Sequence, residues 1–178
     1  MTRKQTLQQL QHKIKSLDEL KVLRDLWARE GKTLVFTNGV FDLIHRGHVE
    51  YLAQARDLGD ILVVGLNSDH SVKRIKGPTR PIQPQEDRAL ILAAFQFVDY
   101  ITIFHEDTPI HVITTLVPDV LVKGGDYTID TVVGHDIVEE HGGKTVILPF
   151  VKDKSSTSII ERILKTQGTA SKTTEGNT

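Results

Sequence analysis

The sequence predicts an α/β fold in which a doubly wound parallel sheet carries helices on both faces. Short, nearly continuous apolar runs alternate with segments of helical periodicity, which is typical of a parallel sheet covered on both sides. The apolar runs cover residues 33–37, 61–66, 100–104, 120–123 and 145–148. The helical segments cover residues 48–58, 69–75, 85–97, 109–116 and 132–141, with a last helix near 156–164. In such folds the ligand binds at the carboxyl ends of the strands, near the point where strand order reverses.

A helical arm precedes the first predicted strand. Leu7, Leu10 and Ile14 have helical spacing, and Ser16 with Glu19 is typical of a capping box that opens a second helix, ending at Gly31. The apolar stripe expected to be buried on this second helix consists of Leu17, Leu20, Leu23, Leu26 and Trp27. We therefore divide the chain into an N-terminal helical arm (1–31), one α/β domain (32–165) and a Thr-, Gly- and Lys-rich tail (166–178) that is expected to be disordered.

Composition excludes several functional classes. The chain has 178 residues, of which 39% are hydrophobic and 25% charged, as in ordinary globular proteins. Without cysteine it has no disulfide, thiolate metal site or cysteine nucleophile. A net charge of −1 offers no broad basic field for nucleic acid, and no apolar run approaches the roughly 20 residues that span a membrane. The basic N-terminus is not followed by an apolar signal segment, so a cytoplasmic protein is expected.

Polar residues follow several predicted strands at the point where each strand ends. They are Thr37-Asn38-Gly39 after the first strand, Asn67-Ser68-Asp69 after the second and Lys123-Gly124-Gly125-Asp126 after the fourth. Because the carboxyl ends of parallel strands meet at one edge of the sheet, we expect these clusters to converge on a site there.

The pair His45 and His48 stands where the helix after the first strand is expected to begin. In one interpretation the imidazoles bind the phosphates of a nucleotide, and Gly47 leaves room for the ligand. In a second interpretation Asp42, His45 and His48 form a two-His-one-carboxylate metal site. In a third they are ordinary residues of a helix start, so spacing alone leaves the three interpretations open.

Two further segments are suited to anions. A basic cluster follows the Asn67-Ser68-Asp69 loop and consists of Lys73, Arg74, Lys76, Arg80 and Arg88. It is either a solvated face or, because Gly77-Pro78 and Pro81 make the segment irregular, a mobile phosphate clamp. Residues 155–158 are Ser-Ser-Thr-Ser before the last helix, which is either a plain N-cap or a second anion site.

Several common motifs are missing. The Gly-rich dinucleotide pattern does not follow the first strand, and the sequence has no Gly-Lys-Ser/Thr phosphate loop. The turn at residues 38–42 also lacks the Gly-x-Ser-x-Gly nucleophile elbow. These absences disfavour hydride transfer, ordinary kinase chemistry and hydrolysis of that type.

Residues 36–48, Phe-Thr-Asn-Gly-Val-Phe-Asp-Leu-Ile-His-Arg-Gly-His, resemble the H-x-G-H nucleotidyltransferases of the cytidylyltransferase-like superfamily. Within it, the chain is most similar to the D-glycero-β-D-manno-heptose 1-phosphate adenylyltransferases, which make ADP-heptose for bacterial lipopolysaccharide. The stretches that support this resemblance are Gly65–Asp69, Lys76-Gly77 with Arg80-Pro81, Val98-Asp99, Pro118–Tyr127 and Ser155–Ile160. The resemblance implies a Rossmann-like sheet and makes residues 32–165 the nucleotidyltransferase domain.

The resemblance also implies roles for individual residues. The catalytic residues would be His45, His48 and Lys76, which contact the phosphates, with His48 stabilising the transition state. The nucleotide-binding residues would be Thr37, Asn38, Gly39, Phe41, Gly47, Lys123, Gly125, Asp126, Ser156 and Thr157. The residues proposed for the acceptor substrate are Asp42, Asn67, Arg80 and Arg88. No residue is assigned as a metal ligand, because Mg²⁺ is expected to be held mainly by the ATP phosphates.

Two other functions stay open at this point. Relatives that use CTP and glycerol 3-phosphate carry an Arg-Thr-Glu-Gly-Ile-Ser-Thr-Thr signature before the last helix, whereas this chain has Val-Lys-Asp-Lys-Ser-Ser-Thr-Ser at 151–158 and Gln96 in place of another arginine. A nucleotide-sensing module without turnover is the alternative outside enzymes. The expected partners are ATP, a sugar 1-phosphate, a second copy of the chain in a homodimer and a separate upstream sugar kinase.

Overall fold

The computed structural model describes residues 3–125, 127–149 and 155–170. The strands are β1 (Leu34–Gly39), β2 (Ile61–Asn67), β3 (Tyr100–Phe104), β4 (Val120–Gly124) and β5 (Lys144–Leu148). The helices are α1 (Arg3–Gln11), α2 (Leu17–Arg29), α3 (Arg46–Arg56), α4 (Asp69–Lys76), α5 (Gln85–Ala93), α6 (Ile110–Leu116), η1 (Ile129–Thr131), α7 (His135–Glu140) and α8 (Ser156–Ala170).

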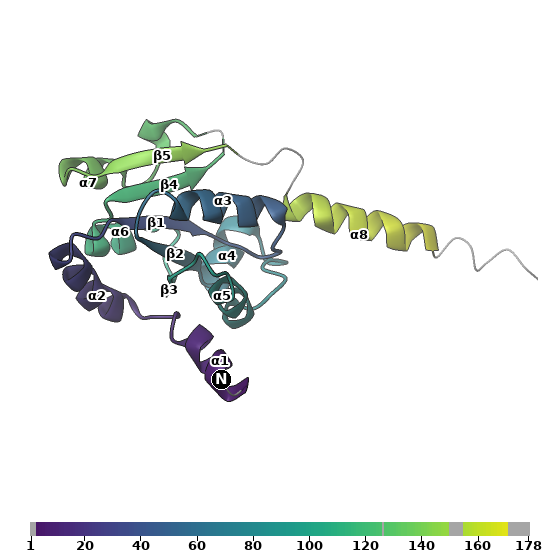
Figure 1. The fold of residues 1–178 in the computed structure, drawn as a ribbon. Coiled ribbons are helices and arrows are strands. Elements are labelled where there is room, and N and C mark those ends of the chain that lie inside the picture. The colour runs from purple at the N-terminus through teal and green to yellow at the C-terminus, as the bar shows by residue number, and fades with distance from the viewer. Residues whose placement is uncertain (1–2, 126, 150–154, 171–178) are drawn as a thin grey trace, which may run out of the picture.

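The sheet has five strands in the order β3-β2-β1-β4-β5, and every pair is parallel (Figure 1). The chain builds outward from β1 to β3 and then crosses back to add β4 and β5 on the other side of β1. Strand order therefore reverses between β1 and β4, where ligands bind in doubly wound sheets. The predicted fold class is confirmed.

Alternate residues of each inner strand enter two separate apolar layers, one on each face of the sheet. In β1, Val35 packs with Leu52 of α3 and Leu92 of α5, while its neighbours Leu34 and Phe36 pack on the opposite face. That second layer contains Leu20 and Trp27 of α2, Val112, Ile113 and Leu116 of α6, and Val138 of α7. Helices thus cover both faces because each strand offers side chains to both.

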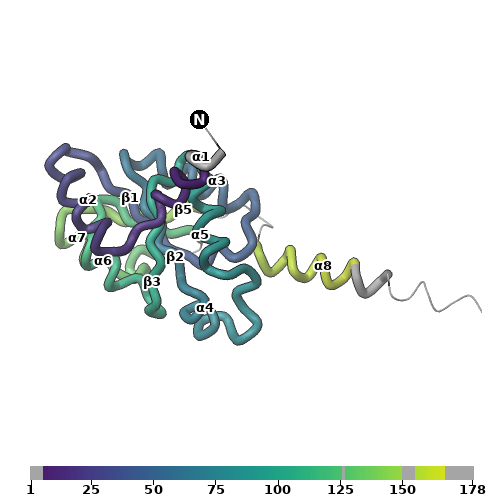
Figure 2. Tube along the Cα trace, turned by 90° about the horizontal axis from the view of Figure 1, so that it is seen from below, coloured from purple at the N-terminus to yellow at the C-terminus, as the bar shows by residue number. Residues whose placement is uncertain are grey.

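The N-terminal arm is attached to the outer edge of β3. Residue Ile14 forms a parallel bridge with Ile101, and the Lys13 ammonium donates hydrogen bonds to the carbonyl oxygens of Phe95 (3.1 Å) and Val98 (2.8 Å). The predicted capping box of α2 is present, because Glu19 N–H donates to Ser16 Oγ at 3.2 Å and the Ser16 N–H donates to the Glu19 carboxylate at 2.8 Å. Figure 2 shows the arm running beside the sheet edge.

Two sequence-based boundaries and one burial prediction are wrong. Helix α5 ends at Ala93 and not at residue 97, because the rings of Phe95 and Phe97 stack at 5.4 Å and pack on the core. The segment 132–141 becomes helical only at His135, after Gly134 adopts a left-handed conformation with φ 85°. Leu26 is 48% exposed and does not belong to the buried stripe of α2.

Helix α8 continues to Ala170, so residues 166–170 are helical and not part of a disordered tail. The remainder of that predicted tail lies outside the described residues. Figures 1 and 2 show α8 projecting from the body of the domain, with its first turn next to the start of α3. Within the described chain, no helix combines the length and the apolar content needed to cross a bilayer.

Candidate functional site

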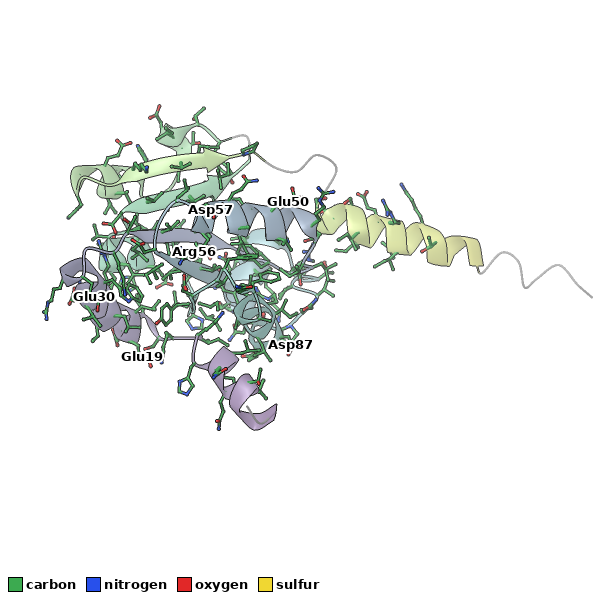
Figure 3. The ribbon with its side chains drawn as sticks, in the orientation of Figure 1. Glu19, Glu30, Glu50, Arg56, Asp57 and Asp87 are labelled. Carbon is green, nitrogen blue, oxygen red and sulfur yellow. The ribbon has the colours of Figure 1, made fainter. Side chains whose placement is uncertain are left out.

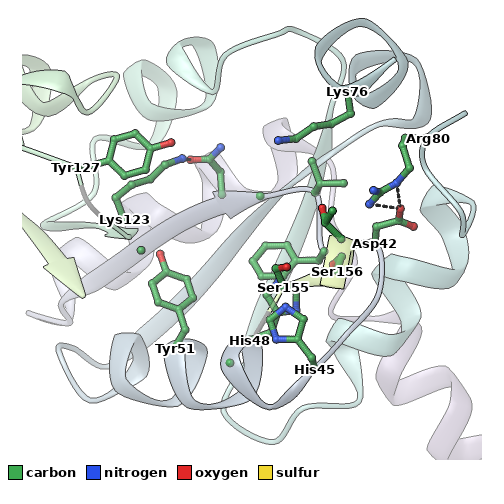
Figure 4. Close-up of a pocket in the computed structure, with 17 residues that line it drawn as sticks. Asp42, His45, His48, Tyr51, Lys76, Arg80, Lys123, Tyr127, Ser155 and Ser156 are labelled. Atoms are coloured by element: carbon green, nitrogen blue, oxygen red, sulfur yellow. Dashed lines mark hydrogen bonds and ion pairs between the residues drawn. The ribbon is translucent and has the colours of Figure 1, made fainter. Parts of the chain in front are cut away.

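The sheet is split at the point where strand order reverses. The pairing of β1 with β4 ends at Phe36 and Leu121, but β1 runs on to Gly39 beside β2 and β4 runs on to Gly124 beside β5. A cavity of about 520 Å³ opens over this split (Figure 4). The residues that line it are Asn38, Gly39, Val40, Phe41, Asp42, His45, Gly47, His48, Tyr51, Lys76, Arg80, Lys123, Gly124, Tyr127, Ser155, Ser156 and Thr157.

The loop after β1 is tightly packed against the pocket wall. Phe41 has a positive φ of 47°, which is strained for a residue with a side chain, and its ring is only 5% exposed. The ring lies 5.2 Å from the His48 ring, and a Cβ on Gly39 would approach the ring to 2.9 Å. Glycine at position 39 therefore leaves the space that the Phe41 ring occupies when it packs on His48.

The two imidazoles lie together at the first turn of α3. His45 is the N-cap residue, and its ring stacks on the His48 ring at 3.9 Å between centroids (Figure 4). Burial, followed by the charge of His45, lowers the pKa of His48 to about 4. His48 is thus neutral at pH 7, and its buried Nδ1 has no hydrogen-bond partner among the described residues. A buried polar atom beside an open pocket indicates a ligand-binding role.

Asp42 faces away from this pair and holds the loop that follows α4. Its carboxylate is 1% exposed and accepts hydrogen bonds from the backbone N–H groups of Ile82 and Gln83, each at 2.9 Å. The Arg80 guanidinium forms an ion pair with it at 2.7 Å. Although burial alone would raise the pKa of Asp42, these hydrogen bonds outweigh it and lower the pKa. Asp42 therefore anchors the loop. Both of its carboxylate oxygens already accept hydrogen bonds, which disfavours the predicted contact with the acceptor substrate.

The pocket has two lysines on opposite walls (Figure 4). Lys76, the last residue of α4, is exposed and forms no ion pair with any described residue. Lys123 on β4 donates a hydrogen bond to Asn38 Oδ1 at 3.2 Å and lies 5.7 Å from the centre of the Tyr127 ring. Burial lowers the pKa of Lys123. Because Asp42 is already paired with Arg80, no acidic side chain on the described pocket wall neutralises these amines, and the pocket favours an anion.

The start of α8 forms the third wall. The Ser156 hydroxyl donates to the carbonyl oxygen of Leu43 at 3.1 Å, which joins α8 to the loop between β1 and α3. Ser155 caps the helix, because the Ser158 N–H donates to Ser155 Oγ at 3.0 Å. Thr157 also lines the pocket. One cap thus explains Ser155, and the Thr157 hydroxyl with the remaining N–H groups of this turn is placed to meet an anion.

Most of the predicted site residues meet in this one pocket. Those that line it are Asn38, Gly39, Phe41, Asp42, His45, Gly47, His48, Lys76, Arg80, Lys123, Ser156 and Thr157. Thr37 and Gly125 lie next to the lining without being part of it, and Asp126 lies outside the described residues.

Two residues predicted to bind the acceptor substrate, Arg88 and Asn67, lie outside the pocket. Arg88 is fully buried, and its guanidinium donates to the carbonyl oxygens of Gln83 (3.0 Å) and Val40 (2.6 Å) and to the carboxylate of Asp69 (2.8 Å). Asn67 is 4% exposed and donates to the Ser71 hydroxyl at 3.0 Å. Neither residue lines the pocket, and their burial and partners disfavour the predicted contact with the acceptor, which stays a prediction. The basic cluster therefore has members in different environments. Lys76 and Arg80 line the pocket, with Arg80 paired to Asp42, whereas Arg88 is buried. Lys73 and Arg74 are exposed.

Three pocket residues, Val40, Tyr51 and Tyr127, were assigned no role from the sequence, and Gly124 and Ser155 were expected there only as members of polar clusters. Tyr51 stands one helical turn after His48, so it was open to prediction from the face that the histidines define. Tyr127 is an aromatic residue two positions after a glycine pair, and its 46% exposure at the pocket rim is unusual for tyrosine.

The geometry disfavours the metal interpretation of Asp42, His45 and His48, because the carboxylate is directed at Arg80 and the two rings stack on each other. Among the described residues, no group of three or more His, Asp or Glu side chains is arranged to hold a metal ion.

A doubly wound sheet with an anion pocket at its switch point, lined by paired imidazoles, lysines and a helix start, is the arrangement with which α/β proteins bind phosphorylated ligands. Residues 36–162 match the cytidylyltransferase-like family, and the chain belongs to it. This confirms the resemblance seen in the sequence.

Named relatives share most of this chain. It is 55% identical over 152 residues to the bifunctional protein HldE of Syntrophotalea carbinolica, and 54% identical over 156 residues to that of Geobacter sulfurreducens. The alignments cover 85% and 88% of this chain but only 31% and 32% of those proteins. The chain thus spans about a third of the length of these relatives.

A solved structure has the same fold. The lipopolysaccharide core biosynthesis protein from Thermoplasma volcanium GSS1 superposes with a TM-score of 0.57 at 29% sequence identity, covering 70% of this chain and 100% of that one.

Proposed function

We propose that the chain is an adenylyltransferase that transfers AMP from ATP to D-glycero-β-D-manno-heptose 1-phosphate, with ADP-heptose and pyrophosphate as products. The observation that carries the proposal is the stacked His45–His48 pair at the N-terminus of α3, facing a pocket whose amines have no acidic partner among the described residues. Identity of 55% to a bifunctional HldE protein and likeness to a lipopolysaccharide core biosynthesis protein support the choice of substrate.

The reaction places a specific demand on the pocket. A sugar 1-phosphate has a second pKa near 6, so at neutral pH its attacking oxygen is already mostly deprotonated, and no general base is required. The attacking phosphate and the triphosphate are both anions and repel each other. The enzyme must therefore hold them in line and offset the charge that develops on the α-phosphoryl group and on the departing pyrophosphate.

We assign this work to the two imidazoles and Lys76. Because His48 is neutral at pH 7, it offers an N–H donor without the desolvation cost of a buried imidazolium, and it stabilises the α-phosphoryl oxygens in the transition state. His45 and the N–H groups of the first turn of α3 contact the phosphates beside it. Lys76, from the exposed end of α4, neutralises the outer phosphates.

The other walls position the rest of the nucleotide. Ser156 and Thr157, in the first turn of α8, are assigned to the β- and γ-phosphates. Lys123 with Asn38, on the two sides of the split sheet, is assigned to the base and ribose.

We further propose that Mg²⁺ enters with ATP. The pocket fits a metal delivered by the triphosphate better than one held by the protein, because Asp42, its lining carboxylate, is engaged by Arg80 and two N–H groups. When bound, Mg²⁺ would neutralise phosphate charge and keep most of its water ligands.

The description of the family as cytidylyltransferase-like favours one alternative, CMP transfer from CTP to glycerol 3-phosphate or a related polyol phosphate. The alternative outside enzymes is a nucleotide sensor. A panel of ATP and CTP crossed with heptose 1-phosphate and glycerol 3-phosphate, read by pyrophosphate release, distinguishes all three. We expect release with ATP and heptose 1-phosphate. Release only with CTP would support the alternative transfer, and tight ATP binding without release from any pair would support the sensor.

The expected partners follow from this reaction. A sugar kinase must supply the 1-phosphate, and we propose that it acts upstream of this domain. A homodimer in the cytoplasm remains our proposal for the assembly and its location.

A further inference from the structure

Tyr51 bridges the split in the sheet directly beneath the pocket. Its hydroxyl donates to the carbonyl oxygen of Val122 on β4 at 3.2 Å and lies 2.6 Å from Thr37 Oγ1 on β1. These two strand positions come immediately after Phe36 and Leu121, the last pair of the β1–β4 ladder. Tyr51 thus replaces, through a side chain on α3, the backbone hydrogen bond that the diverging strands no longer make.

The Tyr51 hydroxyl has no proton left to donate to a bound ligand. A carbonyl oxygen can only accept, so the single Tyr51 proton goes to Val122, and Thr37 Oγ1 donates to Tyr51. Burial raises the pKa of Tyr51, which keeps the hydroxyl protonated. Its role must therefore be exerted through the element that carries it.

That element is the helix with the imidazoles. Tyr51 follows His48 by three residues, so both side chains lie on the same face of α3. The far end of α3 is held separately, because Arg56 forms an ion pair with Asp99 at 3.0 Å; Figure 3 shows Arg56 at the end of the helix opposite to Glu50. At the end with the histidines, Tyr51 attaches the helix to both sides of the split, through Thr37 on β1 and Val122 on β4.

We propose that Tyr51, together with Thr37, is a positioning residue that fixes the first turn of α3 and thereby the place of His48 in the pocket. The inference deepens the proposed function and rests on it for the catalytic readout alone. It also gives Thr37 a role different from the predicted nucleotide contact, because Thr37 is fully buried.

The test is Tyr51→Phe, which removes the oxygen and keeps the ring. Loss of the tether lets water reach His48, and we expect its pKa, about 4 in the wild type, to rise to about 5 or higher in an NMR titration of the ligand-free protein. With ATP and heptose 1-phosphate we expect kcat to fall about 10-fold or more, while the KM for ATP changes less than about threefold. Thr37→Val, which removes only the second partner, should shift both quantities in the same direction by less.

Tyr100→Phe is the matched control, because Tyr100 loses the same atom but packs on Trp27 (ring centroids 5.2 Å apart) away from the pocket. Its kcat and the His48 pKa should match those of the wild type. A Tyr51→Phe protein whose melting temperature falls while kcat and the His48 pKa stay unchanged would overturn the proposal, because the tether would then be merely structural. If no substrate pair gives turnover even in the wild type, the proposed function fails, and the titration alone decides the role of Tyr51.

Discussion

The anchor between Asp42 and the loop after α4 gives a quantitative prediction. Asp42→Ala removes the carboxylate and leaves two N–H groups and the Arg80 guanidinium, 19% exposed, without their acceptor. Removing one partner of a buried ion pair costs about 3–5 kcal/mol, because the remaining charge stays desolvated. We expect the free energy of unfolding to fall by about this amount.

Urea denaturation at pH 7 measures this loss, with Asp107→Ala as the matched control. Asp107 also forms an ion pair with an arginine, Arg74, at 2.5 Å, but the side chains are 56% and 38% exposed. Exposed pairs contribute about 0–1 kcal/mol, so the control should remain within that range of the wild type. Equal losses for Asp42→Ala and Asp107→Ala would refute the reasoning, because burial would then make no difference.

The contribution of Asp42 to the free energy of unfolding depends on pH, and the direction follows from its pKa. The pKa of Asp42 is lowered in the folded protein, so its contribution is present above the ordinary aspartate pKa and is lost as pH falls through the lower folded value. The difference in unfolding free energy between wild type and Asp42→Ala should therefore shrink at acid pH. A difference that grows at acid pH would contradict the account.

Three further predictions concern the pocket. His48→Ala should lower kcat by about 10²-fold or more, the scale of one lost transition-state donor, with an unchanged circular dichroism spectrum; near-wild-type turnover would remove His48 from the mechanism. The His48 pKa of about 4 lies below its ordinary value of 6.5, so wild-type stability should rise by about 3 kcal/mol between pH 4 and 6.5. In urea titrations His48→Gln should lack that increment, and an equal slope in both proteins would argue against it. Gly39→Ala places a Cβ 2.9 Å from the Phe41 ring and should weaken ATP binding by calorimetry, whereas Gly142→Ala, with no atom within 4 Å of its Cβ, should leave binding unchanged even if its positive φ costs stability. Equal affinities of Gly39→Ala and the wild type would show that this contact does not shape the pocket.

The sequence predicted those features that depend on local pattern. The strand at Tyr100–Phe104 has the predicted bounds, because apolar alternation with flanking helices is a local signal. Strand β1 runs two residues past its apolar run, since Asn38 and Gly39 continue to pair with β2. Pairing with a neighbour is a tertiary property that the run itself does not display.

The site was predicted less completely for the same reason. His45, Gly47 and His48 lie close together in the sequence, so their spacing showed them. The role of Asp42 depends on Arg80, 38 residues away, and the role of Arg88 depends in part on Val40, 48 residues away. The positive charge of Arg88, in a segment rich in basic residues, predicted that it binds phosphate. Only the fold shows that the Arg88 guanidinium already donates hydrogen bonds to Val40, Gln83 and Asp69.

The most direct measurement is a crystal structure of the protein with Mg²⁺ and a non-hydrolysable ATP analogue. We predict a triphosphate in the pocket at the split between β1 and β4, with its oxygens within hydrogen-bond distance of His45 and His48 and near Lys76. A triphosphate bound elsewhere on the domain, with both imidazoles out of contact, would contradict the account.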